Sequence, residues 1–161
     1  MPEITEIHIG VQGRPTPQGS KKFGQHGQLL ESAGAHLTAW RSAVKRATFG
    51  RYLEIGLSRD DLPVFDKGVG VVFGGTFWLN HGRDITTPPD LDKLLRATWD
   101  GLTEARLWRD DGQVLHIAWA TKRKTEDGGP GADLWVCRPD TLDMEHLAYR
   151  QRWILGAQEA A

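Results

Sequence analysis

The chain has 161 residues, of which 25% are charged and 39% hydrophobic, and its formal net charge is −1. This length suffices for one domain with a sizeable core, and the composition is ordinary for a globular protein. No apolar run approaches the roughly 20 residues of a membrane-spanning helix, and the start lacks the pattern of a signal peptide. The single cysteine, Cys137, excludes an internal disulfide and a cysteine zinc site. We therefore expect one cytoplasmic domain over residues 1–161, without a membrane partner.

Hydrophobic periodicity and turn residues predict the elements of this domain. In chain order they are a strand at 4–11, a flexible loop at 14–33, a helix at 37–52, a strand at 68–79, a helix at 90–104, strands at 114–121 and 132–137, and a C-terminal helix within 141–161. Gly74 and Gly75 indicate a bulge or a close backbone approach in the second strand. The last two strands are expected to pair as a hairpin. This order predicts an α/β or α+β fold, with a mixed sheet of about four strands and helices packed on it.

Positive charge is concentrated in the first third of the chain, where residues 13–51 contain seven Lys and Arg against Glu31 alone. A second basic cluster is Lys122-Arg123-Lys124. Such clusters either contact nucleic-acid phosphates or form a solvated charged surface. The residues that we select as candidates for contacts with DNA phosphates are Lys21, Lys22, Arg41, Lys45 and Lys122.

Four aspartates flank the predicted helix at 90–104. Asp90 and Asp92 lie at its start, where Pro88 and Pro89 precede it, and Asp110 and Asp111 follow it just before a strand. Taken singly, an aspartate at a helix start is usually a cap and paired aspartates in a loop usually form a turn. Taken together, the carboxylates are the hard oxygen ligands that suit Mg²⁺, which also binds phosphate oxygens. The set therefore predicts a metal site for phosphodiester chemistry.

This ordered set resembles the RusA-type Holliday-junction resolvases. The resemblance rests on Asp90-Leu91-Asp92-Lys93-Leu94-Leu95-Arg96, then Asp100-Gly101-Leu102, then Asp110-Asp111-Gly112-Gln113-Val114, with spacings that match without a gap. These residues lie within 90–114, while the segments at 15–22 and 40–44 resemble phage-type members more loosely. Two positions depart from the family pattern, because Lys93 replaces an asparagine and Arg96 replaces a functional lysine.

The resemblance implies a Mg²⁺-dependent endonuclease, with Mn²⁺ as a substitute and no organic cofactor, acting as a homodimer on four-way DNA junctions. Such an enzyme makes paired nicks that leave two ligatable duplexes; if phage-encoded, it would work in the cytoplasm of the bacterial host. By the same resemblance Asp90, Asp92 and Asp111 match the metal-binding acids, and Asp110 is a fourth candidate. Arg96 or Lys93 takes the role of the family lysine, stabilising charge on the phosphate.

Several alternatives remain open at this stage. Arg96 can instead form an i,i+4 ion-pair ladder with Asp92 and Asp100, and Trp108 can pack in the core instead of contacting a base. For the whole chain, the rivals are a nuclease acting on flaps or forks, a junction-binding protein with impaired catalysis, and a nucleotide-sugar transferase using Asp-x-Asp with Mn²⁺. The chain is short for such a transferase and lacks a nucleotide-binding unit.

Overall fold

The computed structural model describes residues 3–19, 21–23, 29–31, 34–80, 84–125 and 128–141, with only the backbone described for 21–23 and 29–31. The elements in chain order are β1 (Glu6–Gln12), β2 (Lys21–Phe23), β3 (Leu29–Glu31), α1 (Gly34–Glu54), η1 (Arg59–Asp61), β4 (Val71–Leu79), α2 (Leu91–Glu104), η2 (Asp111–Gln113), β5 (Val114–Lys124), β6 (Gly131–Cys137) and η3 (Pro139–Thr141). Among these described residues, no helix is long and apolar enough to cross a membrane.

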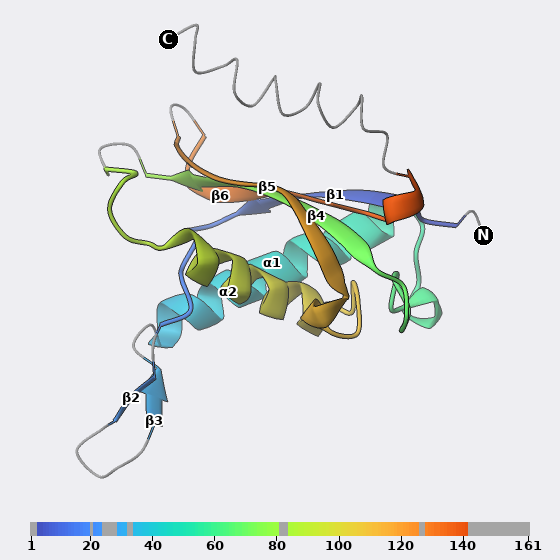
Figure 1. Cartoon of the computed structure of the whole chain (residues 1–161), viewed down its shortest axis with the longest axis horizontal. Coiled ribbons are helices and arrows are strands. Elements are labelled where there is room, and N and C mark those ends of the chain that lie inside the picture. Colours follow the sequence, from blue (N-terminus) through green and yellow to red (C-terminus); the bar gives the residue numbers. More distant parts are fainter. Residues whose placement is uncertain are drawn as a thin grey trace, which may run out of the picture.

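Four strands form one mixed sheet in the order β1-β6-β4-β5. β6 runs antiparallel to both β1 and β4, whereas β5 runs parallel to β4. The parallel pair is joined through α2, as parallel neighbours require a crossover connection. Both α1 and α2 lie on one face of the sheet (Figure 1). The predicted α+β fold with a mixed sheet of four strands and packed helices is therefore confirmed.

The main core lies between the sheet and the two helices. β1 alternates exposed and buried residues, so that Ile7, Ile9 and Val11 face the helices, as its sequence pattern predicts. The two helices cross closely at Gly101, where an added Cβ would lie 2.9 Å from the Cβ of Val44. A buried hydrogen bond also links the two helices, in which the indole N–H of Trp40 donates to the hydroxyl of Thr98 at 3.1 Å.

The opposite face of the sheet carries a smaller apolar cluster. It consists of Val72, Ala118, Trp135 and Cys137, with Trp119 packed against it. The rings of Trp119 and Trp135 are stacked with their centroids 5.2 Å apart. An added Cβ on Gly74 would lie 2.5 Å from the Trp119 ring, and the β4–β5 register shifts between Phe73 and Gly74. The bulge and close approach that Gly74 predicts are thus both present.

The predicted hairpin between the last two strands is wrong. β6 pairs with β1 and β4, and β4 separates it from β5. The physical reason lies in burial: six of the seven residues of β6 are buried, which suits an interior strand, whereas β5 is exposed at 115–117 and suits an edge. The short turn between the two strands is compatible with a hairpin, but the demand to bury both faces of β6 decides the order.

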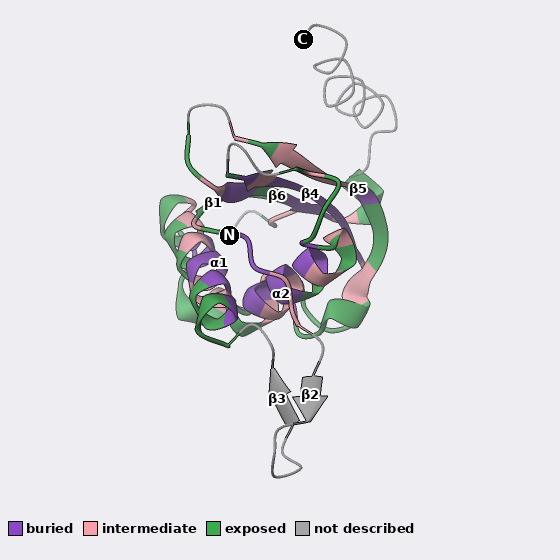
Figure 2. Cartoon of the chain, turned by 90° about the vertical axis from the view of Figure 1, so that its left-hand side faces the viewer, coloured by how far each residue is buried: buried purple, intermediate pink, exposed green. Residues whose placement is uncertain are grey.

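Two further sequence predictions concern segments that the structure describes only in part. The segment predicted as a flexible loop, 14–33, contains the antiparallel strands β2 and β3, with Lys21 opposite Glu31. The predicted C-terminal helix lies outside the described residues except for Thr141, which ends η3. In Figure 2 the buried residues, coloured purple, lie on the strands of the four-stranded sheet and on α1 and α2.

Candidate functional site

The start of α2 presents two carboxylates to the surface. Asp90 is the N-cap residue, with extended φ and ψ of −68° and 138°, but its side chain makes no capping hydrogen bond. Its carboxylate instead accepts from the Lys93 ammonium at 2.9 Å. Asp92 lies in the first helical turn and is exposed. Since neither carboxylate is used as a cap in the described structure, the capping interpretation does not account for this pair.

The charges around Asp90 are arranged to keep it ionised. The hydrogen bond from the Lys93 ammonium, reinforced by its charge and by that of Lys122, lowers the pKa of Asp90 below its usual range. The same bond to Asp90 raises the pKa of Lys93. Because both side chains are exposed to solvent, the ion pair between Asp90 and Lys93 changes the charge state of the site but adds little to the stability of the fold.

The basic end of β5 lies beside this start of α2. The Lys122 ammonium donates to the backbone oxygens of Pro89 at 3.0 Å and Thr87 at 3.2 Å. Just upstream, the carboxylate of Asp84 accepts from the backbone N–H of Thr86 at 2.9 Å, and this bond is the main cause of its lowered pKa. The lead-in to α2 is therefore fixed by side-chain bonds, with a lysine next to Asp90.

The N-terminal basic segment is tied to the same end of α2. The backbone N–H of Gln18 donates to the backbone oxygen of Lys93 at 3.1 Å. Lys21 and Lys22 follow within four residues and begin β2, although their side chains lie outside the described residues. In Figure 1 the β2–β3 hairpin extends from the end of the molecule where α2 begins. The role of Lys21 and Lys22 in contacts with DNA stays a prediction.

The remaining candidate cations lie on the helices. Arg41 of α1 forms an ion pair with Asp100 of α2, with their side chains 22% and 35% exposed. Asp100 thus joins the two helices. Arg96 is exposed, and among the described residues no ion pair joins it to Asp92 or Asp100, so the predicted alternative of an i,i+4 ladder is not what forms. Lys45 is half-buried on α1.

The second aspartate pair occupies a tight turn at the start of β5. The carboxylate of Asp110 accepts from the backbone N–H of Gly112 at 2.8 Å and caps η2, whereas Asp111 is exposed. Trp108, just before this turn, is fully buried, and its indole N–H donates to Thr103 at 2.7 Å. Of the two interpretations of Trp108, packing in the core and contact with a base, the structure therefore shows packing in the core.

Gln113 holds this turn in place, a role that the sequence does not reveal. Its side-chain oxygen accepts from the backbone N–H groups of Arg109 at 2.9 Å and Asp110 at 3.2 Å. The two hydrogens of its side-chain NH₂ are shared among three backbone oxygens of the 65–69 loop, those of Phe65, Asp66 and Val69, at 2.9–3.2 Å. The only sequence signal is the position of Gln113 within the motif that contains Asp110 and Asp111.

The two aspartate pairs lie at opposite ends of α2. Asp90 and Asp92 are at its first turn, whereas Asp110 and Asp111 follow its last turn, and α2 has 14 residues, which corresponds to about 21 Å. The β4–β5 register agrees, since Val114 pairs with the first residue of β4 and Lys122 pairs near its end. In the described part of the chain, no group of three His, Cys, Asp or Glu residues is close enough to hold a metal ion. One copy therefore does not gather the predicted ligands.

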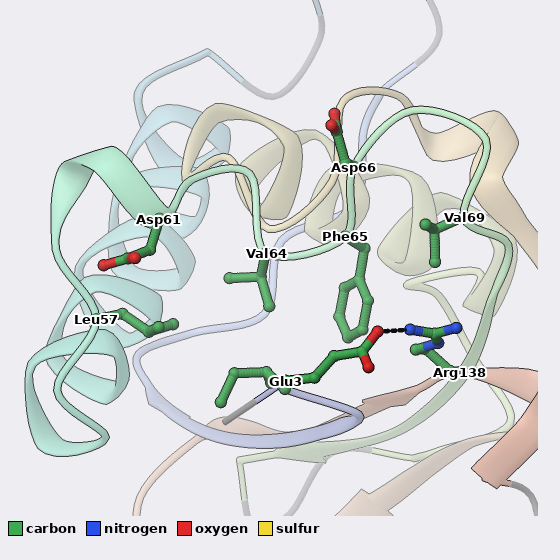
Figure 3. Close-up of a pocket in the computed structure, with 9 residues that line it drawn as sticks. Glu3, Leu57, Asp61, Val64, Phe65, Asp66, Val69 and Arg138 are labelled. Carbon is green, nitrogen blue, oxygen red and sulfur yellow. Dashed lines mark hydrogen bonds and ion pairs between the residues drawn. The ribbon is translucent and has the colours of Figure 1, made fainter. Parts of the chain in front are cut away.

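A separate cavity of about 410 Å³ lies away from the start of α2. Its lining is Glu3, Ile4, Leu57, Asp61, Val64, Phe65, Asp66, Val69 and Arg138. Figure 3 shows Glu3 and Arg138 paired across it, while Asp61 accepts from Ser58 and Asp66 from Arg109. These bonds lower the pKa values of Asp61 and Asp66. The cavity contains none of the predicted site residues, and its charged groups already have partners.

Comparison with known proteins supports the interpretation of the motif. No family model matches the chain. The chain is similar to a phage resolvase. Over 101 residues it is 29% identical to the crossover junction endodeoxyribonuclease rusA of Enterobacteria phage 82, which covers 63% of this chain and 72% of that protein. This is a distant relationship, and it agrees with the resemblance carried by the aspartate motif.

Proposed function

We propose that this chain is a Mg²⁺-dependent endodeoxyribonuclease that resolves four-way DNA junctions by paired nicks. The observation that carries the proposal is the exposed pair Asp90 and Asp92 at the start of α2, surrounded by the cations Lys93, Arg96 and Lys122. Carboxylates beside cations suit a site that must hold a metal ion and a phosphate together. The similarity to the phage 82 crossover junction endodeoxyribonuclease supports the same chemistry.

The metal site proposed here is shared between two copies of the chain. Asp92 and Asp111 are exposed carboxylates, which have the right chemistry for Mg²⁺, but they lie at opposite ends of α2, a helix about 21 Å long. Metal–oxygen bonds of about 2.0–2.6 Å cannot join ligands at that separation. Asp90 and Asp92 of one copy would therefore act with the partner's Asp111, while Asp110, which caps η2, keeps that turn in position.

The chain's own residues have distinct tasks in this proposal. When bound, Mg²⁺ polarises the scissile phosphate and lowers the pKa of a water molecule. Arg96 binds the phosphate oxygens and stabilises the charge that develops there, as its exposed guanidinium allows. Lys93 keeps Asp90 ionised. Lys122 holds the backbone ahead of Asp90 through two carbonyl oxygens.

Cleavage of a labelled four-way junction with and without Mg²⁺ tests the activity directly. We expect paired nicks that require the metal, and faster cleavage of the junction than of a flap or a fork carrying the same sequences. Asp92→Asn should abolish cleavage and leave junction binding largely intact, because the exposed side chain bears no capping role in the fold. Metal-independent cleavage, or no cleavage of any branched substrate, would refute the proposal.

A mixed dimer tests whether the site is shared. A dimer of one Asp92→Asn copy and one Asp111→Asn copy, isolated with two different tags, retains one intact site and loses the other. We expect it to nick one strand, whereas each homodimer is inactive. The matched control combines Asp90→Asn with Asp92→Asn, which damages the same half of both sites and should show no rescue. Equal inactivity of both mixed dimers would exclude a shared site.

A second candidate function is junction binding without cleavage. It is favoured by the ion pair between Lys93 and Asp90, because a proposed metal ligand is engaged by a lysine where the resolvase pattern has asparagine. Lys93→Asn distinguishes the two cases. If the ion pair blocks the metal, the variant should gain Mg²⁺-dependent cleavage; if Lys93 only tunes Asp90, wild-type protein should already cleave.

A further inference from the structure

The cavity of about 410 Å³ shown in Figure 3 lies at the end of the molecule that contains η2. One of its lining residues, Val69, accepts through its backbone oxygen from the side-chain NH₂ of Gln113 at 2.9 Å. The proposed metal ligands Asp90 and Asp92 lie at the other end of α2. A volume of this size is typical of sites for small molecules, which measure about 300–1,000 Å³. The proposed nuclease function does not account for this cavity.

Apolar side chains form much of the wall of the cavity. Phe65 and Leu57 are only 1% and 8% exposed, so the core holds them in place. The other apolar residues of the lining are partly buried and pack against the same core. Five of the nine lining residues are apolar, namely Ile4, Leu57, Val64, Phe65 and Val69. A fixed apolar wall of this kind gains free energy when it covers the apolar part of a ligand.

The charged residues of the lining give the cavity a negative charge. They are three carboxylates and one guanidinium, that of Arg138, which leaves a net charge of −2. The ion-pair partners outside the lining are Arg109 on Asp66 and Asp140 on Arg138. These partners add one charge of each sign and leave the balance unchanged. Such a lining repels DNA phosphates and attracts a cation.

Asp61 is the carboxylate that can bind such a cation. Its Oδ2 accepts from the backbone N–H and from the hydroxyl of Ser58, both at 2.7 Å. These bonds lower the pKa of Asp61, which keeps the carboxylate ionised near neutral pH. Its other oxygen, Oδ1, has the capacity to accept from a ligand. Figure 3 shows Asp61 and Leu57 on one side of the cavity, so the charged and apolar parts of the wall adjoin.

The other carboxylates of the lining are less suited to this role. Glu3 forms an ion pair with Arg138, and the carboxylate of Asp66 accepts from the guanidinium of Arg109 at 2.7 Å. A ligand would compete with these ion pairs for Glu3 or Asp66. Asp61 can instead bind a cation through Oδ1 while it keeps both bonds from Ser58 on Oδ2.

We propose that this cavity is a binding site for a small organic cation with an apolar body. The ammonium group of the ligand pairs with Asp61, and its apolar body packs against Leu57, Val64 and Phe65. This site is separate from the proposed nuclease site, and its test does not depend on cleavage.

Two small probes with opposite charges test the site by NMR titration of the whole chain. Phenethylamine joins an ammonium to an aromatic ring, whereas phenylacetate joins a carboxylate to the same ring. We expect phenethylamine to cause saturable shifts in the backbone amides of Leu57, Val64 and Phe65, with a Kd on the order of 1 mM. Phenylacetate should bind roughly 10-fold more weakly or not at all, because its charge is repelled by the lining.

Matched variants locate the probe. Asp61→Asn keeps the size of the side chain and an acceptor oxygen but removes the charge, so it should weaken phenethylamine binding roughly 10-fold. Asp60→Asn is the control, since Asp60 is exposed next to Asp61, does not line the cavity and loses the same charge. Its affinity for phenethylamine should equal that of the wild type.

A second variant keeps the test valid if Asp61→Asn disturbs η1. Val64 is half-buried in the wall, so Val64→Trp should fill part of the cavity and abolish phenethylamine binding in a protein that circular dichroism shows to be folded. No saturable shifts with phenethylamine, or equal affinity for both probes, would overturn the proposal. So would an equal loss of affinity in Asp60→Asn and Asp61→Asn, or unchanged binding by Val64→Trp.

Discussion

Replacing Gln113 with alanine should lower the free energy of unfolding far more than the same replacement of an exposed glutamine. Its side-chain oxygen accepts from two backbone N–H groups of the Arg109–Asp110 turn, and its two amide hydrogens are shared among three backbone oxygens of the 65–69 loop, equivalent to about four hydrogen bonds. At about 0.5–1.5 kcal/mol for each bond, less the compensation by water at this partly exposed site, Gln113→Ala should cost about 3 kcal/mol. For a chain of this length that corresponds to a fall in Tm of roughly 10 °C.

Urea and thermal unfolding measure this cost, with Gln12→Ala as the control. Gln12 is an exposed residue at the end of β1 and should change stability by no more than about 0.5 kcal/mol when replaced. Because Gln113 holds the turn that carries Asp110 and Asp111, the variant should also lose cleavage activity at temperatures where it is fully folded. A Gln113→Ala protein as stable as Gln12→Ala would show that these hydrogen bonds contribute nothing net to stability, and the reasoning would fail.

Two further predictions concern charge pairs. A double-mutant cycle on Arg41→Ala and Asp100→Ala should give a coupling energy of about 1 kcal/mol, which is larger than for a fully exposed pair because both side chains are mostly covered. A coupling energy near zero would mean that the ion pair does not stabilise the fold and that DNA binding is the remaining role proposed for Arg41. Lys93→Ala should raise the pKa of Asp90 toward its usual range in a carboxyl NMR titration, while Asp61, whose pKa is lowered by Ser58, should not move. Since the lowered pKa favours the folded state only when Asp90 is ionised, that contribution exists above the usual aspartate pKa of about 4 and disappears as the pH falls.

The parts of the fold that depend on local sequence could be predicted. The start of α2 follows from Pro88 and Pro89, and β1 from the alternation of Ile7, Ile9 and Val11. Gly74 and Gly75 predict a bulge or a close approach, and the structure shows that the neighbour at Gly74 is the Trp119 ring. These features are set by residues that are neighbours in the chain or by the absence of a Cβ.

The order of the strands could not be predicted, because it depends on which strand is buried on both faces. A turn after β5 predicts that β6 pairs with it, but β6 instead fills the space between β1 and β4. The roles of Gln113 and Arg41 were hidden for a similar reason. Their partners, Val69 and Asp100, are 44 and 59 residues away in the chain, so no spacing rule relates them.

The length of α2 links the proposed chemistry to the proposed assembly. A helix of 14 residues keeps Asp92 and Asp111 at opposite ends of one copy, so a single copy offers only half of the proposed ligands at each end. Under this proposal a monomer cannot cleave, and a two-fold dimer has two sites, one for each of two strands related by the symmetry of a four-way junction. Cleavage should therefore rise with the fraction of dimer as protein concentration increases, in parallel with sedimentation. Full activity per chain at concentrations where the protein is monomeric would show that cleavage does not require a dimer. Asp92 and Asp111 would then not act together in a site shared between two copies.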